Sequence, residues 1–161
     1  MSASAPRSTP RPPNGFSLVE LLLVAVILGI LAQLAIPNYK AVRDRARAVE
    51  AMADVDVIEQ AARDFQADNL RWPDDVGPGS IPPGLQPHLP GDFDFEGENY
   101  LLDWERYETP GGLPGDPAVR RILGVGIVTS DEGLGRALTD VFGERGWFAV
   151  GPSYIWIIER E

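Results

Sequence analysis

Residues 15–37 read GFSLVELLLVAVILGILAQLAIP. From residue 21 to residue 36 the stretch is apolar except for Gln33. A helix that rises about 1.5 Å per residue covers about 31 Å from Phe16 to Ile36, enough for the ~30 Å hydrocarbon core of a bilayer. Residues 16–37 therefore predict a membrane-spanning helix, with the carboxylate of Glu20 near the edge of the lipid.

The segment in front of this helix has a different composition. Residues 1–15, MSASAPRSTPRPPNG, contain four prolines, two arginines and no acidic side chain. Proline interrupts helices, and a segment this polar buries little apolar surface. We predict that residues 1–15 form a leader or tail outside the folded part of the protein.

Beyond Pro37 the helix is predicted to continue as an amphipathic segment over residues 38–68. Apolar residues recur there at spacings of three and four, which places them on one helical face: Ala48, Ala51, Val55, Ile58, Ala62 and Phe65. Charged residues lie between them and are expected to face water; they include Arg45, Arg47, Asp54, Asp56, Glu59 and Arg63. The helix is expected to end at DNLRWP, residues 68–73, where Asn69 takes a left-handed or capping conformation.

The remainder, residues 69–161, predicts a loop-rich region and a small C-terminal antiparallel sheet. Strands are expected at residues 122–129, 147–150 and 154–159, and a short helix at 131–142. Residues 100–107 fit a strand or a short helical turn, and we predict a strand. The predicted class is α+β: one long N-terminal helix, hydrophobic in its first half and amphipathic in its second, packed on the sheet.

Four aromatic side chains lie in the last two predicted strands. They are Trp147, Phe148, Tyr154 and Trp156. Because they fall in strand-patterned runs, we expect them to pack in the core and the hairpin rather than to form a ligand platform.

The composition excludes several classes of function. A formal charge of −10 opposes binding to nucleic acid, and the absence of cysteine excludes disulfides and cysteine-based metal sites. His88 is the only histidine, so a histidine-based zinc site or triad has no second member. We find no pattern of catalytic residues and predict that the protein is not an enzyme and has no cofactor.

One acidic run leaves a minor metal hypothesis open. The sequence DFDFEGE contains Asp92, Asp94, Glu96 and Glu98, whose carboxylates are ligands that calcium accepts. Their spacing fits no EF-hand pattern, and a solvated acidic loop is the commoner meaning of such a run.

The junction Gly15-Phe16-Ser17-Leu18-Val19-Glu20, followed at once by the apolar run, resembles the processing site of type IV pilins and type II secretion pseudopilins. The resemblance implies that a prepilin peptidase cuts between Gly15 and Phe16 and methylates the new amino terminus. Glu20 stands at the family's fifth mature residue. Gly29 and Pro37 match its usual small residue and helix-loosening proline.

The same resemblance implies the partners and the location. The partners would be copies of the chain, other pilin-like subunits, the peptidase and methyltransferase, an inner-membrane assembly platform and the lipid bilayer. The protein would cross the inner membrane once, with its C-terminal domain in the periplasm or extracytoplasmic space. A secretion pseudopilin and a pilus or competence pilin are not separated by these residues.

Elementary electrostatics gives an independent reason for the position of Glu20. An ionised carboxylate near hydrocarbon is costly without a cation, and no Lys or Arg lies within one helical turn. Cleavage after Gly15 would create a cation, the amine of Phe16, and in the family the glutamate is thought to pair with the amine of a neighbouring subunit.

Two readings compete with this one, and one feature departs from it. Glu20 in the first helical turn of an ordinary signal anchor is favoured by the helix dipole, so a signal-anchored extracytoplasmic binding module that does not polymerise is the alternative function. A cleaved secretory signal is disfavoured because no small-x-small site follows the apolar core. The charge balance is also a departure: Lys40, Arg43, Arg45 and Arg47 follow the span and only Arg7 and Arg11 precede it, against the positive-inside expectation.

Overall fold

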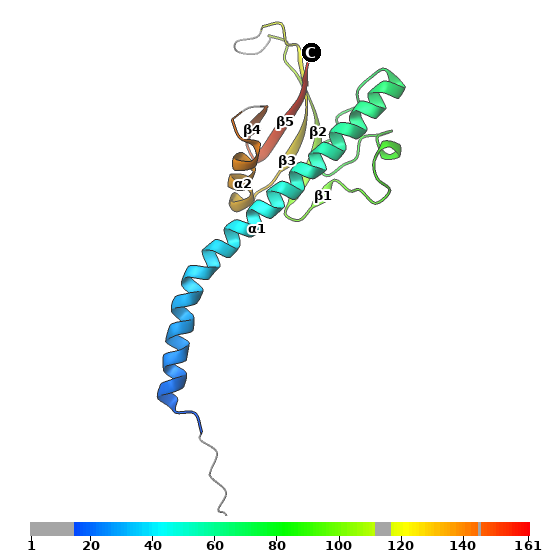
Figure 1. Cartoon of the computed structure of the whole chain (residues 1–161). Helices are drawn as coiled ribbons and strands as arrows, with labels where there is room; N and C mark the ends of the chain where they lie inside the picture. Colours follow the sequence, from blue (N-terminus) through cyan, green and yellow to red (C-terminus); the bar gives the residue numbers. More distant parts are fainter. Residues whose placement is uncertain (1–14, 112–116, 145) are drawn as a thin grey trace, which may run out of the picture. The chain divides into compact units, whose positions relative to one another are not determined.

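The computed structural model describes residues 15–111, 117–144 and 146–161. The expected leader, residues 1–15, therefore lies outside the described residues except for Gly15. The chain divides after Asn38 into two compact units, residues 1–38 and 39–161. The second unit is the globular one, and the first contributes the beginning of the long helix (Figure 1).

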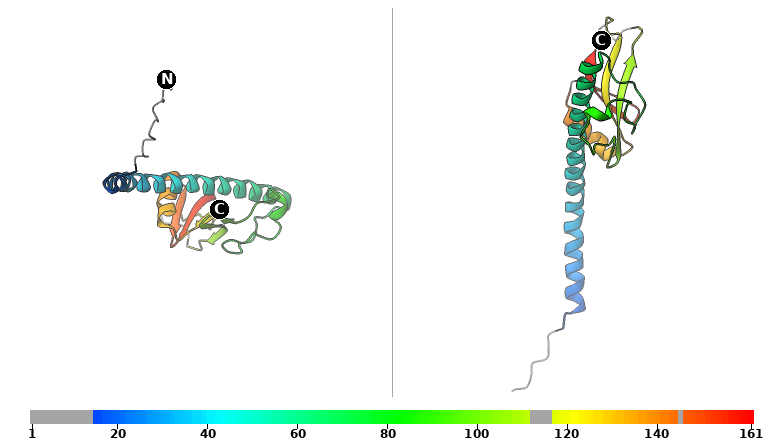
Figure 2. Two further views of the ribbon diagram at one scale, coloured as in Figure 1. Left: turned by 90° about the horizontal axis from the view of Figure 1, so that it is seen from below. Right: turned by 90° about the vertical axis from the view of Figure 1, so that its right-hand side faces the viewer.

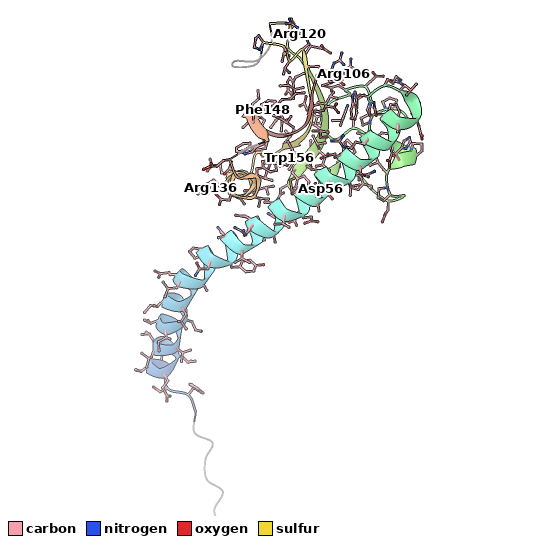
Figure 3. All side chains as sticks on the ribbon, turned by 45° about the horizontal axis from the view of Figure 1, so that its top comes forward. Asp56, Arg106, Arg120, Arg136, Phe148 and Trp156 are labelled. Carbon is pink, nitrogen blue, oxygen red and sulfur yellow. The ribbon has the colours of Figure 1, made fainter. Side chains whose placement is uncertain are left out.

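Helix α1 is a single helix of 52 residues, Leu18–Asn69, which confirms the prediction that the helix over residues 16–37 continues through residues 38–68. Within this helix, a stretch of 18 residues has a mean hydropathy of 2.6, and none of that stretch is buried inside the protein. By length and composition this helix can cross a membrane. The side chains of the first unit point away from the helix axis on all sides (Figure 3).

The globular unit contains one five-stranded antiparallel sheet with the order β1-β2-β3-β5-β4 (Figure 1). Its strands are β1 Glu96–Gly97, β2 Tyr100–Glu108, β3 Arg121–Val128, β4 Trp147–Val150 and β5 Ser153–Arg160. A short helix, α2 Glu132–Phe142, separates β3 from β4, and a 3₁₀ turn, η1 Gln86–His88, lies in the long connection after α1. The four predicted strands and the predicted short helix are confirmed.

Two small elements were not predicted. The two-residue strand β1 lies in the acidic run, and η1 lies in the segment expected to be loop. Both elements are too short to show a periodic pattern, because the alternation of a strand or the repeat of a helix needs several residues to be recognised.

One face of the sheet is covered by the amphipathic half of α1, which runs along it (Figure 2). The predicted apolar face of α1 is confirmed, since all six of its positions are buried. They join the inward side chains of the sheet and of α2 in one core, which includes Leu102, Trp104, Leu123, Val125, Ile127, Leu134 and Leu138. Alanines on the helix let its backbone approach the sheet closely, and the larger strand residues fill the remaining space.

The aromatic residues of the last hairpin pack as predicted. The ring of Phe142 in α2 lies 5.5 Å from that of Trp147 and 5.6 Å from that of Trp156. Trp147 also stacks with Tyr154 at 6.3 Å. Phe148 contacts Tyr107 instead, with an edge-to-face geometry at 5.7 Å. These contacts secure α2 and the β4–β5 hairpin on the sheet.

The end of α1 differs in detail from the prediction. Asn69 remains helical, and its side-chain amide donates to the carbonyl of Phe65 at 2.9 Å, so the capping role is confirmed. The left-handed residue is Leu70, with φ of 55°. The N–H of Leu70 donates to the carbonyl of Gln66 at 2.8 Å, in the pattern of a helical hydrogen bond. The left-handed backbone of Leu70 then directs the chain away from the helix.

Candidate processing and assembly site

The expected cleavage point lies immediately before α1. Residues 15–17 precede the helix, and the side chain of Phe16 is 75% exposed. No atom of the chain, among the described residues, lies within 4 Å of where a side chain on Gly15 would begin. The bond between Gly15 and Phe16 therefore lies outside the helix and is not covered by other described residues.

The first turn of α1 is closed by a capping box. Ser17 is the N-cap, and its Oγ accepts a hydrogen bond from the N–H of Val19 at 3.2 Å. The carboxylate of Glu20 reaches back and accepts a bond from the N–H of Ser17 at 2.9 Å. These two bonds satisfy amide groups that a helix start otherwise leaves unpaired.

This box changes what can be said about Glu20. The Ser-x-x-Glu spacing of Ser17 and Glu20 predicts a capping box by itself, a signal that the electrostatic argument for Glu20 did not use. The box gives the carboxylate a hydrogen-bond donor but no countercharge. No ion pair to Glu20 occurs within the described residues, so its charge has no cationic partner there.

The apolar surface that follows has no cover within the chain. Thirteen large hydrophobic side chains from Leu18 to Ile36 are exposed: Leu18, Val19, Leu21, Leu22, Leu23, Val24, Val26, Ile27, Leu28, Ile30, Leu31, Leu34 and Ile36. Full burial of such a side chain is worth about 1.5–3 kcal/mol. Leaving this surface in water is therefore strongly unfavourable, and lipid or other helices must cover it.

Gly29 and Pro37 both lie inside this part of α1. Pro37 has no N–H, so the helix lacks one of its regular hydrogen bonds at that point, although the helix remains unbroken. Around Gly29 nothing within the described residues would obstruct a side chain. Packing inside the chain thus does not require a glycine at residue 29. The role of both residues in loosening the helix stays a prediction.

The carboxylates considered for calcium do not form one cluster, because they make different contacts. Asp94 accepts a hydrogen bond from the N–H of Phe95, Glu96 lies in β1, and Glu98 pairs with Arg47. Among the described residues, no three acidic or histidine side chains form a group suited to a metal ion. Calcium binding by Asp92 and its neighbours stays an untested hypothesis that this geometry does not favour.

Arg47 is the one clear error in the predicted pattern of α1, because it is buried and not in water. Only 5% of the residue is exposed, and its guanidinium pairs with Glu98 before β2 and lies 3.8 Å from Asp131. A single cation thereby joins α1, the β1–β2 turn and the start of α2. The long apolar stem of arginine explains how a charged residue can occupy the edge of the apolar face.

Asp131, which lies beside the guanidinium of Arg47, is also the N-cap of α2. Its Oδ1 accepts hydrogen bonds from the N–H of Gly133 at 2.8 Å and of Leu134 at 3.2 Å. The Leu134 N–H, with further help from Gly133 and the charge of Arg47, holds the pKa of Asp131 below its usual range. The carboxylate is therefore ionised and stabilised in the folded unit.

We predict that Asp131→Ala destabilises the globular unit. Loss of an N-cap costs about 0.5–2 kcal/mol, and the substitution also removes one partner of buried Arg47. Urea unfolding of the full chain in detergent, followed by tryptophan fluorescence, should show a lower midpoint, because all four tryptophans lie in this unit. Asp140→Ala is the matched control, since Asp140 is an exposed residue of the same helix; equal midpoints for both variants would contradict the prediction.

A second acidic pair lies on the sheet face away from α1. Asp103 and Glu105 alternate with the inward residues Leu102 and Trp104 on β2. They stand opposite Gly126 and Gly124, and the missing side chain of Gly126 leaves room for both. Asp103 is only 3% exposed, and its Oδ1 has no hydrogen-bond partner among the described residues.

Burial, followed by the charges of Glu105 and Asp75, raises the pKa of Asp103 to about 8. Burial also raises the pKa of Glu105, and it raises that of Tyr107 on the same strand to about 12. A proton on Asp103 would let it donate to Glu105 and would satisfy the buried oxygen. Sequence periodicity could have placed both acids on one face, but not their degree of burial.

Comparison with known proteins bears on the N-terminal part of the chain. Residues 11–32 match the family described as the prokaryotic N-terminal methylation motif. Type II secretion system core protein G of Aeromonas hydrophila is 40% identical over 63 residues, which are 39% of this chain and 44% of that protein. The protein of the same name from Pseudomonas aeruginosa is 38% identical over 63 residues, with the same two shares, 39% and 44%.

A third relative of that name, from Escherichia coli K12, is 36% identical over 60 residues, 37% of this chain and 41% of the relative. The chain thus spans less than half the length of the curated relatives it matches. No solved structure matches it significantly. Residues 11–32 of this chain match the prokaryotic N-terminal methylation motif, and the chain is similar over 63 residues to type II secretion system core protein G, which confirms the resemblance to pilins and pseudopilins.

Proposed function

We propose that the protein is a structural pseudopilin-type subunit of a filament that is assembled from the inner membrane. One observation carries the proposal. An accessible Gly15–Phe16 bond directly precedes a helix whose apolar surface is uncovered and whose Glu20 has no cationic partner within the described chain. Cleavage would supply the missing cation at Phe16, and packing of helices would cover the apolar surface.

The secretion branch of the family is the better supported one. The relatives reported above bear the name type II secretion system core protein G, and each is similar to this chain over 60 to 63 residues. The globular unit, residues 39–161, adds a surface of its own, since the similarity extends over 63 residues or fewer. Its role in the filament is to present that surface while α1 packs.

The proposed topology places residues 1–15 in the cytoplasm and the globular unit in the periplasm. The basic residues after the span argue against it when they are simply counted. The proposal follows the processing motif at residues 11–32 instead, and the basic residues after the span remain a departure from the rule.

We predict that the mature protein begins with N-methylated Phe16. Mass spectrometry of the native protein from membranes tests this directly, and a Gly15→Asp variant is the control that should keep its leader. An intact wild-type N-terminus would instead indicate a signal-anchored binding module. A start beyond residue 32 would indicate a secreted protein. Either result would overturn the proposal.

A further inference from the structure

The side of α1 that faces away from the sheet carries a second apolar stripe. It consists of Tyr39, Val42, Ala46, Val49 and Ala53, all of them exposed and all in the globular unit. Tyr39 is 69%, Val42 70% and Val49 53% exposed. At 3.6 residues per turn the stripe is centred about 170° from the buried face, so the sheet does not approach it.

The spacing of the stripe is that of a two-stranded coiled coil. Successive members are separated by 3, 4, 3 and 4 residues, the alternation of a and d positions in a heptad. Tyr39, Ala46 and Ala53 take the a positions, and Val42 and Val49 take the d positions. Asp56 and Gln60 stand at the next two positions, so the apolar pattern ends after Ala53.

The charges beside the stripe identify the partner. In this heptad Arg45 is a g residue and Glu50 is an e residue. In a parallel pair of identical helices in register, each g residue faces the e residue five positions later on the other helix. Arg45 of each copy therefore meets Glu50 of the other, twice by symmetry. Neither side chain has an ion-pair partner among the residues that the structure describes.

We infer that residues 39–53 of α1 are a docking surface for the same segment of a second copy, packed parallel and in register, with paired Arg45 and Glu50. The inference rests on the proposed function in one respect. Two copies anchored in one bilayer have parallel helices at the same depth, and confinement to the membrane raises their effective concentration. That confinement matters because a stripe of about 21 Å is too short to hold two free helices together.

The geometry leaves room for this pair. The globular units would lie on the two outer sides of the paired helices, because each sheet lies opposite the stripe. Ala46 and Ala53 allow the backbones to approach closely, and Val42 and Val49 supply most of the contact. The apolar contact of two valines from each copy is small, which suits a reversible precursor of assembly.

The absence of cysteine makes a cross-linking test clean, because each introduced cysteine is the only thiol. Val49→Cys in the full-length chain, oxidised in native membranes, is expected to form a covalent dimer. Ala41→Cys is the control: it is exposed on the same helix, about two turns nearer the span, and it points away from the stripe. Its dimer should form at least about fivefold more slowly.

Charge reversal tests the partner and the register. Arg45→Glu in the Val49→Cys background should slow cross-linking about fivefold, and adding Glu50→Arg should restore it. Equal rates for Val49→Cys and Ala41→Cys would overturn the inference, as would failure of the double reversal to restore the rate. Mass analysis of the N-terminus in the same samples separates the two proposals, because processing at Phe16 without cross-linking defeats only the docking surface.

Discussion

Glu20→Gln is expected to leave cleavage after Gly15 intact and to stop the subunit from entering filaments. Glutamine can still accept the hydrogen bond that the Ser17 N–H donates to Glu20, so the capping box survives. What it lacks is the negative charge that would attract the amine of Phe16 on a neighbouring copy. A charged hydrogen bond is worth about 1.5–3 kcal/mol, which corresponds to a loss of about 10–100-fold in incorporation.

Glu20→Ala is the informative companion, because it removes both the cap and the charge. If the charge matters, the two variants should fail equally, and the small cost of the lost cap should show only as fraying of the first turn. The measurement is the ratio of filament-bound to membrane-bound subunit, with N-terminal mass analysis as the check on processing. Normal incorporation of Glu20→Gln together with failure of Glu20→Ala would show that Glu20 acts as a cap and not as a docking charge.

The features of the fold that could be predicted are those with a repeating pattern. The apolar run of residues 21–36 and the 3-4 spacing from Ala48 to Phe65 repeat over many residues, and both gave the correct helix. The strands of the last hairpin were found because aromatic and β-branched residues stand on either side of the Gly151-Pro152 turn. The tiny strand β1 has no such repetition.

The features that could not be predicted depend on contacts between distant parts of the chain. Arg47 has the sequence context of a solvent-facing charge, and only the arrival of Glu98 and Asp131 allows its burial. The second apolar stripe, which includes Val49, was not predicted for a related reason. The strong apolar pattern of the buried face indicates only which residues pack on the sheet, and the shorter apolar pattern on the opposite side of the helix is not needed to explain that packing. The capping box of Ser17 and Glu20 was readable but was not sought.

Asp103→Asn is expected to make the globular unit more stable at pH 8 and to flatten the dependence of its stability on pH. The folded pKa of about 8 is far above the ordinary value of 3.8, so the folded unit binds a proton that the unfolded chain releases. The contribution of Asp103 to stability is therefore greatest below about pH 4 and falls as the pH rises towards 8, at up to about 1.4 kcal/mol per pH unit. The raised pKa of Glu105 adds a contribution of the same sign.

Asparagine keeps the shape of the protonated acid and can donate its amide N–H to Glu105, but it carries no charge at any pH. We expect a gain of about 2 kcal/mol at pH 8, which raises the midpoint of thermal unfolding by about 5–10 °C for a unit of this size. Tryptophan fluorescence of the full chain at pH 5 and pH 8 measures both the gain and the slope. Asp140→Asn, exposed on α2, is the control for a change in net charge. A wild-type slope that survives in Asp103→Asn would mean that Asp103 is already ionised in the folded unit, and that the open sheet face tolerates two adjacent negative charges.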